Sequence, residues 1–199
     1  MQSLFLLYAY LLLNDENLLL EGQKLLEKEL ENKVERVSGL IDFPDQKNSP
    51  KASPYFWDGT AGIVTVLLRY ASVTQDKDLL EKAEYYAKRM EYRQTMSPSL
   101  IYGMAGIGNT YLDCYFLLGN KEYLKNAYEC AESCRLFLAE KDGIKTFTDV
   151  FGLKYSCDFA FGTMGVLSFF DRLEKKNKTN FLICGDEIMS CVGENKVYV

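Results

Sequence analysis

The sequence contains no histidine among its 199 residues. This absence excludes a Ser-His-Asp triad, a Cys-His nucleophile pair and every metal site built on imidazole. Any proton transfer must therefore use Asp, Glu, Tyr, Lys, Cys or water. None of these groups titrates near neutral pH unless its surroundings shift its pKa.

Cysteine is present, but never as a C-x-x-C pair. The six cysteines stand at positions 114, 130, 134, 157, 184 and 191. Cys130 and Cys134 share one face of a helix, and we interpret them as small buried residues; a Cys-only metal site is the alternative. No secretory signal pattern precedes the cysteines, so the sequence predicts a cytoplasmic protein with reduced thiols.

Long apolar runs and excess positive charge are also missing. The longest apolar run, Leu4–Leu13, is too short to span a bilayer. The net charge is −5, and no basic patch suggests nucleic-acid binding. With 48% apolar and 26% charged residues, the chain has the composition of a globular protein that can bury a sizeable core.

Three segments of the chain repeat the pattern Gly-x-[Ala/Met]-Gly-[Ile/Val], each followed by an apolar stretch. The glycines that define the pattern are Gly59, Gly62, Gly103, Gly106, Gly162 and Gly165. After the first two motifs comes a polar break and then a charged amphipathic segment, over Leu79–Tyr92 and Lys121–Leu138. The sequence therefore predicts hairpins of an apolar inner helix and an amphipathic outer helix.

The remaining segments fit between these hairpins. Residues Met1–Leu13 and Leu18–Asn32 form another inner and outer pair. The segment Val34–Pro54 is rich in turn residues and is predicted to be loop with a short strand at Gly39–Phe43. Alternating apolar residues in Lys141–Phe159 indicate a small β-hairpin, and the last twenty residues show no repeat pattern.

The first inner helix is apolar on every face, which is typical of a helix buried on every side. A terminal repeat normally carries a polar capping face instead. The sequence therefore predicts a missing N-terminal neighbour and an exposed apolar edge. We expect the chain to dimerise through this edge, or to associate through it with the missing N-terminal part of the fold.

The motif glycines allow two interpretations. Glycine permits close backbone approach, so the motifs could serve only to pack the inner helices tightly. Helix N-termini also offer free N–H groups and partial positive charge. Inner helices that converge on one cavity could thus hold an anion, a thiolate or an enolate.

The three motifs resemble those of the lanthionine synthetase C-like cyclases, most closely the cyclase domain of class III kinase–cyclase lanthipeptide synthetases. They span Phe56–Ile63, Tyr102–Asn109 and Asp158–Gly165, and Phe169–Leu173 resembles the final repeat of that domain. The resemblance implies an all-α fold that is part of an (α/α)6 toroid with small β-hairpin insertions. It further implies that residues 1–199 are a single domain, the C-terminal half of a full toroid.

The resemblance implies a role in lanthipeptide biosynthesis, in which a peptide cysteine thiol adds to dehydroalanine or dehydrobutyrine and forms a thioether ring. The implied partners are a precursor peptide and the missing cyclase half, kinase and lyase domains or a second copy. One alternative is a cyclase half that binds the peptide or a partner without turnover. Another is an (α/α)-barrel carbohydrate-active enzyme that uses Asp58, Asp113 and Asp158.

Zinc-bearing members of this family carry Trp-Cys-x-Gly before one motif and Cys-His-Gly at the next. The matching positions here read Leu100–Gly103 and Ala160–Gly162, without a ligating side chain, and Cys157 lies three residues from the expected place. The comparison predicts a zinc-independent cyclase with no metal site and no cofactor.

A zinc-free site must activate the thiol by other means. We take Asp58 as the candidate base or orienting acceptor, with Asp158 and Tyr102 as proton acceptor and enolate donor. A helix N-cap is the alternative role for both aspartates, and core packing is the alternative for Trp57 and Tyr102. The predicted substrate-binding residues are Trp57, Gly59, Gly62, Gly103, Gly106, Phe161, Gly162 and Gly165.

Overall fold

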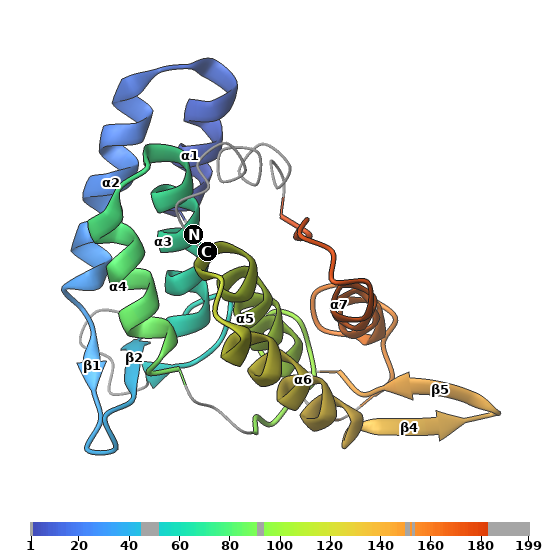
Figure 1. The fold of residues 1–199 in the computed structure, drawn as a ribbon. Coiled ribbons are helices and arrows are strands. Elements are labelled where there is room, and N and C mark those ends of the chain that lie inside the picture. The colour runs from blue at the N-terminus through green and yellow to red at the C-terminus, as the bar shows by residue number, and fades with distance from the viewer. Residues whose placement is uncertain (1, 45–51, 91–93, 150–151, 153, 183–199) are drawn as a thin grey trace.

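The computed structural model describes residues 2–44, 52–90, 94–149, 152 and 154–182. Three helical hairpins follow one another along the chain and stand side by side in an arc that ends at a seventh helix (Figure 1). The helices are α1 (Gln2–Leu13), α2 (Glu16–Leu30), α3 (Thr60–Thr74), α4 (Lys77–Ala87), α5 (Met104–Leu118), α6 (Lys121–Arg135) and α7 (Thr163–Lys175). The inner helices α1, α3, α5 and α7 pack one against the next, which is the arrangement predicted for part of a helical toroid.

Two small antiparallel sheets connect the hairpins. The first has the order β1 (Val34–Glu35), β2 (Ile41–Pro44), β3 (Ala52–Ser53), and the second pairs β4 (Leu138–Lys141) with β5 (Ile144–Phe147). The strand predicted at Gly39–Phe43 corresponds to β2, which begins only at Ile41 because Gly39 has a φ of +80° and belongs to the turn before it. The second hairpin begins before its predicted start because its turn is Asp142–Gly143, with both φ angles positive.

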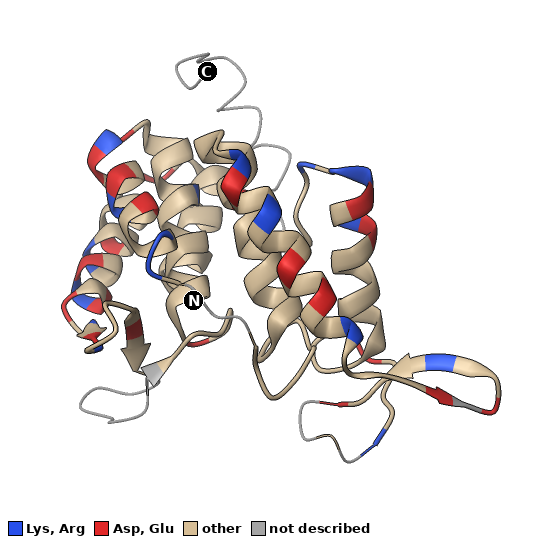
Figure 2. Cartoon of the chain, turned by 60° about the horizontal axis from the view of Figure 1, so that its bottom comes forward, with Lys and Arg blue, Asp and Glu red and all other residues tan. Residues whose placement is uncertain are grey.

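The outer helices are amphipathic and end earlier than their apolar periodicity suggested. Helix α4 stops at Ala87 and α6 at Arg135, since Leu138 belongs to β4. Charged side chains gather on α2, α4 and α6, whereas the helices they cover carry few charges (Figure 2). Side chains of Asp15, Asp76 and Asn120 cap the outer helices.

Helix α1 is only partly buried. Leu4, Leu7 and Tyr8 belong to the core, but the side chains of Phe5 and Leu12 are 71% and 73% exposed. Part of the apolar surface of this helix is therefore uncovered in this chain, and the predicted exposed apolar edge is present. Assembly through that edge stays a prediction.

A buried ion cluster joins three inner helices. Asp113 of α5 accepts hydrogen bonds from Arg69 of α3, at 2.9 Å, and from Arg172 of α7, at 2.6 Å. All three residues stand ten positions after the first glycine of their motif, so the internal repeat places them at the same level of neighbouring helices. The amide of Asn180, beyond α7, donates to both oxygens of Asp113.

The two arginines keep Asp113 ionised. Burial alone would raise the pKa of the Asp113 carboxyl, but the charges of Arg69 and Arg172 outweigh it and lower this pKa below its ordinary value. Burial likewise works against the charge of Arg69, yet the carboxylate raises the pKa of Arg69. Asp113 and Arg69 are therefore charged at neutral pH, and the cluster links α3, α5 and α7.

None of the helices in the described part of the chain combines the length and the apolar character needed to span a membrane.

Candidate functional site

The three glycine motifs follow loops of one design, Ser53–Gly59, Ser97–Gly103 and Ser156–Gly162. Each loop begins with a serine six residues before its first glycine. The serine hydroxyl accepts a hydrogen bond from the backbone N–H two residues later, at 3.3, 3.1 and 3.3 Å. Sequence reasoning missed these serines, although their constant spacing from the glycines was the signal that could have found them.

Close backbone packing explains five of the six motif glycines. A Cβ atom at Gly59 would lie 2.1 Å from the Ser53 carbonyl oxygen, and one at Gly103 would lie 2.4 Å from that of Ser97. A Cβ atom at Gly162 would likewise lie too close to the carbonyl oxygen of the third serine, Ser156. The second glycines Gly106 and Gly165 meet carbonyl oxygens of their own loops at 2.0 and 2.1 Å. A side chain at any of these positions would push the loop away from its helix.

Carbonyl groups of the same loops accept hydrogen bonds from N–H groups at the starts of the inner helices. Met104 N–H donates to the Ser97 carbonyl at 3.1 Å, and Thr163 N–H donates to the Ser156 carbonyl at 2.8 Å. In α3, Ala61 N–H donates to the Pro54 carbonyl at 3.2 Å. These N–H groups are not free to hold an anion, because the loops themselves accept their hydrogen bonds, and this favours the packing interpretation of the glycines.

Backbone hydrogen bonds also tie the three loops together. Trp57 N–H donates to the Ile101 carbonyl at 3.4 Å, and Ile101 N–H donates to the Ala160 carbonyl at 3.1 Å. These residues occupy the same place in successive loops, two positions before the first glycine. The loops therefore form one continuous layer across the N-terminal ends of α3, α5 and α7.

Aromatic side chains cover this layer. Tyr102 stacks on Phe161 with ring centroids 6.1 Å apart, and Tyr55 meets Tyr102 edge to face at 5.9 Å. The structure thus brings together Tyr102 and Phe161 from two different motifs. Trp57 is 53% exposed and is not a core residue.

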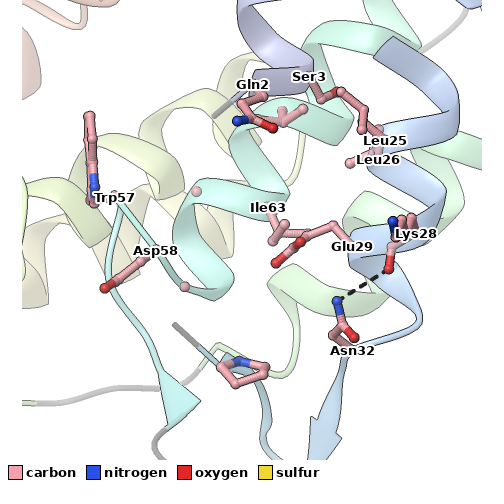
Figure 3. A pocket seen from close by; sticks show the side chains of 14 residues that line it. Gln2, Ser3, Leu25, Leu26, Lys28, Glu29, Asn32, Trp57, Asp58 and Ile63 are labelled. Atoms are coloured by element: carbon pink, nitrogen blue, oxygen red, sulfur yellow. Dashed lines mark hydrogen bonds between the residues drawn. The ribbon is translucent and has the colours of Figure 1, made fainter. Parts of the chain in front are cut away.

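A cavity of about 510 Å³ lies beside the first loop, between α1, α2 and the start of α3. Figure 3 shows Trp57 and Asp58 on one side, Lys28 and Asn32 on the other, and Ile63 between them. The predicted site residues that line it are Trp57, Asp58, Gly59 and Gly62. Those that do not line it are Tyr102, Gly103, Gly106, Asp158, Phe161, Gly162 and Gly165.

Asp58 is half-buried in the cavity wall. Its Oδ1 accepts a hydrogen bond of 2.7 Å from the Ser53 hydroxyl. The N-cap of α3 is Gly59, without a side-chain cap, so the alternative role of Asp58 as a helix cap is wrong. Burial raises the pKa of the neighbouring Tyr55, and the charge of Asp58 raises it further, so the Tyr55 phenol stays protonated. Ser53 therefore fixes the orientation of the Asp58 carboxylate.

Asp158 holds its own loop. Its carboxylate accepts hydrogen bonds from the Ser156 hydroxyl and, at 2.6 Å, from Phe161 N–H. The Ser156 hydrogen bond, followed by backbone N–H groups of the loop, lowers the pKa of Asp158 below its ordinary value. It does not cap α7, whose N-cap residue is Gly162 and which has no side-chain cap. The catalytic roles of Asp158 and Tyr102 stay predictions, and neither residue reaches the cavity.

Asp113 is unsuited to the carbohydrate-active alternative. That chemistry needs two carboxyl groups facing a sugar, one of which donates a proton. Asp113 is buried between two arginines, which lower its pKa. It can neither reach a substrate nor carry the proton.

The described residues contain no group of three or more His, Cys, Asp or Glu side chains placed to hold a metal ion. Cys130 and Cys134 are buried in α6, as interpreted from their spacing. Burial raises the pKa of the Cys130 thiol to about 12 and that of Cys134 well above its ordinary value. Both remain thiols at neutral pH, which disfavours metal binding. Cys184 and Cys191 lie outside the described residues.

We expect brief treatment of the native protein with iodoacetamide at pH 8 to label Cys157 and to spare Cys114, Cys130 and Cys134. Cys157 is exposed, whereas the other three are buried and Cys114, like the α6 pair, has a raised pKa. Peptide mapping by mass spectrometry reads the labelled positions. In urea all of them should react, and rapid labelling of Cys130 before unfolding would contradict the burial described.

A search of curated proteins found no match to this chain. A family model described as lanthionine synthetase C-like protein matches residues 2–184, which is nearly the whole chain and includes all three loops and the cavity. The chain belongs to the lanthionine synthetase C-like family.

Proposed function

We propose that this chain is a lanthionine cyclase domain of the class III type that closes thioether rings in a precursor peptide without zinc. The observation that carries the proposal is the match to the lanthionine synthetase C-like family across residues 2–184. The cavity beside the first motif supports it, since it combines an exposed tryptophan with a carboxylate held in place.

The reaction is an addition that conserves all atoms. The S–H bond of a peptide cysteine breaks, and the sulfur forms a bond to Cβ of a dehydroalanine or dehydrobutyrine. The π electrons of the alkene move into an enolate, and Cα then takes up a proton. The proton lost by the thiol equals the proton gained at Cα, so the peptide mass does not change.

The difficult step is formation of the thiolate, because a thiol with a pKa of about 8.5 is only a few per cent ionised at neutral pH. Asp58 is the candidate group that accepts or orients the thiol proton at the cavity wall. Trp57 supplies an apolar surface beside it for the peptide. Binding both reacting groups in one cavity also raises their effective concentration.

The residues at the positions where zinc-bearing members of the family have ligands support zinc independence. Ile101, Ala160 and Phe161 stand there, and none has an atom that binds a metal. The site must then rely on Asp58, on proximity and on exclusion of water. A metal chelator should accordingly leave the rate of ring formation unchanged.

The test is thiol alkylation of a dehydrated, cysteine-containing precursor peptide after incubation with the full chain. Ring closure removes a free thiol, so mass spectrometry should show loss of the alkylation adduct faster than without protein. We expect Asp58→Asn to slow this loss at least about tenfold, because an amide cannot accept the thiol proton. Unfolding curves should be nearly the same for variant and wild type.

Asp171→Asn is the matched control. Asp171 is an exposed aspartate on α7 whose partner is Lys175, and its replacement should not change the rate. Alkylation of the peptide at the background rate with wild-type protein would reject catalysis by this chain. Peptide binding without turnover would then support the non-catalytic, peptide-holding alternative.

A further inference from the structure

The chain beyond α7 folds back onto Arg172. Asn177 N–H donates to the Arg172 carbonyl at 3.0 Å. The Arg172 guanidinium in turn donates to the carbonyls of Asn177 and Lys178, at 3.2 and 3.1 Å. Arg172 is also a member of the buried ion cluster, so the cluster fixes the direction in which the chain leaves α7.

Asn180 is the second anchor of this segment. Its side chain is buried, and its amide nitrogen donates to Asp113 Oδ1 at 3.1 Å and to Oδ2 at 2.8 Å. Hydrogen bonds to an ionised carboxylate are stronger than those between neutral groups. Asn180 is therefore held against α5, although it stands 67 positions after Asp113 in the sequence.

Phe181 then reaches two of the three loops. Its ring lies 5.2 Å from that of Phe56 and 5.8 Å from that of Phe159, centroid to centroid. Phe56 is buried and directly precedes Trp57 and Asp58, and Phe159 directly follows Asp158. One side chain thus touches the first and the third loop, each next to a candidate site residue.

We infer that Asn180 and Phe181 form a clasp that fixes the first and third loops, which makes Phe181 a positioning residue for the cavity wall of Trp57 and Asp58. The anchor on Asp113 sets where Phe181 lies, and the paired rings set where Phe56 lies. Without the ring, Phe56 loses an aromatic neighbour and the loop gains freedom to move. The effect on ring formation rests on the proposed function, whereas the effect on the loop does not.

Trp57 is the sole tryptophan of the chain, so its fluorescence reports on the first loop alone. We expect Phe181→Ala in the full chain to shift the emission of Trp57 to longer wavelength and to increase its quenching by acrylamide. In the alkylation assay the same variant should lower kcat about tenfold, with little change in KM, because the carboxylate is misplaced. Asn180→Ala should shift the emission in the same direction.

Phe170→Ala is the matched control. Phe170 is another partly buried phenylalanine, on α7, but its ring meets Phe147, Phe169 and the Arg135 guanidinium, and none of these ring contacts within the described residues involves a loop of the site. It should lower stability without changing the Trp57 spectrum. Phe181→Leu, which keeps most of the side-chain volume, should restore part of the wild-type spectrum and serves as the test if Phe181→Ala does not fold.

An unchanged Trp57 spectrum in folded Phe181→Ala would overturn the clasp, even if ring formation fell. The same shift in Phe170→Ala would also overturn it, because general loosening would then explain the result. Absence of ring formation in the wild-type chain would reject the proposed function, and the fluorescence comparison would still decide on the clasp.

Discussion

Replacing Asp113 with alanine is expected to lower the free energy of unfolding by about 3–5 kcal/mol, because it leaves two buried arginines without their carboxylate. Arg69 and Arg172 are 3% and 5% exposed, so water cannot replace the lost partner. Urea denaturation followed by circular dichroism measures the change. The loss should be large enough that the variant is only marginally folded at room temperature.

A surface ion pair provides the comparison. Glu132→Ala removes the partner of Arg135 on α6, where both side chains are mostly exposed, and should cost less than about 1 kcal/mol. An Asp113→Ala variant no less stable than Glu132→Ala would show that the buried cluster does not hold the helices together.

The cluster also predicts how stability depends on pH. The pKa of Asp113 in the folded chain lies below its value in the unfolded chain. The contribution of Asp113 to the free energy of unfolding is therefore fully present above about pH 4, which is the pKa of its carboxyl in the unfolded chain. This contribution is lost as the pH falls through the pKa of the same carboxyl in the folded chain. In the Asp113→Asn variant the free energy of unfolding should fall less steeply at acid pH. The weaker dependence that remains comes from groups such as the exposed Asp158.

Gly106→Ala is expected to destabilise the chain by about 3 kcal/mol, although alanine is the better helix former by about 1 kcal/mol. The new Cβ would lie 2.0 Å from the Leu100 carbonyl oxygen and 2.9 Å from Cβ of Phe56. The first of these atoms is backbone and cannot turn away, so the second loop must move. Thermal and urea unfolding measure the loss, and Trp57 fluorescence reports whether the disturbance reaches the first loop.

Gly39→Ala is the control for the loss of a glycine as such. Nothing lies within 4 Å of its Cβ position, and the cost comes only from a φ of +80°. We expect Gly39→Ala to lower the free energy of unfolding by about 1 kcal/mol. Equal losses at the two positions would mean that backbone freedom, and not close packing, explains the glycine of the second motif.

Local pattern was enough to predict the helices. The apolar period within each segment reflects the helix period, and the polar breaks mark the hairpin turns, so three inner–outer pairs were predicted close to their observed positions. The boundaries were less accurate. Helix α6 ends at Arg135, and from Leu138 onward the chain pairs with β5, a contact that helical periodicity does not contain.

The sequence likewise indicated only part of the candidate site. Trp57, Asp58 and two glycines of the first motif line a cavity, and their roles in binding and catalysis stay predictions. The opposite wall comes from Lys28 of α2 and from Asn32, just beyond α2, and neither residue carried a signal in the sequence. The role of Asp158 was also hidden, because only the folded loop shows that its carboxylate is engaged by Ser156 and by Phe161 N–H.

The sequence by itself determined the repeated hairpins, the three glycine motifs and the absence of histidine chemistry. These are properties of single segments, in which neighbours along the chain are neighbours in space. Tertiary structure alone decided the ion cluster and the clasp, whose contacts to Asp113 join residues 44, 59 and 67 positions apart. The packing of one helix against the next sets such contacts, and no local period encodes them.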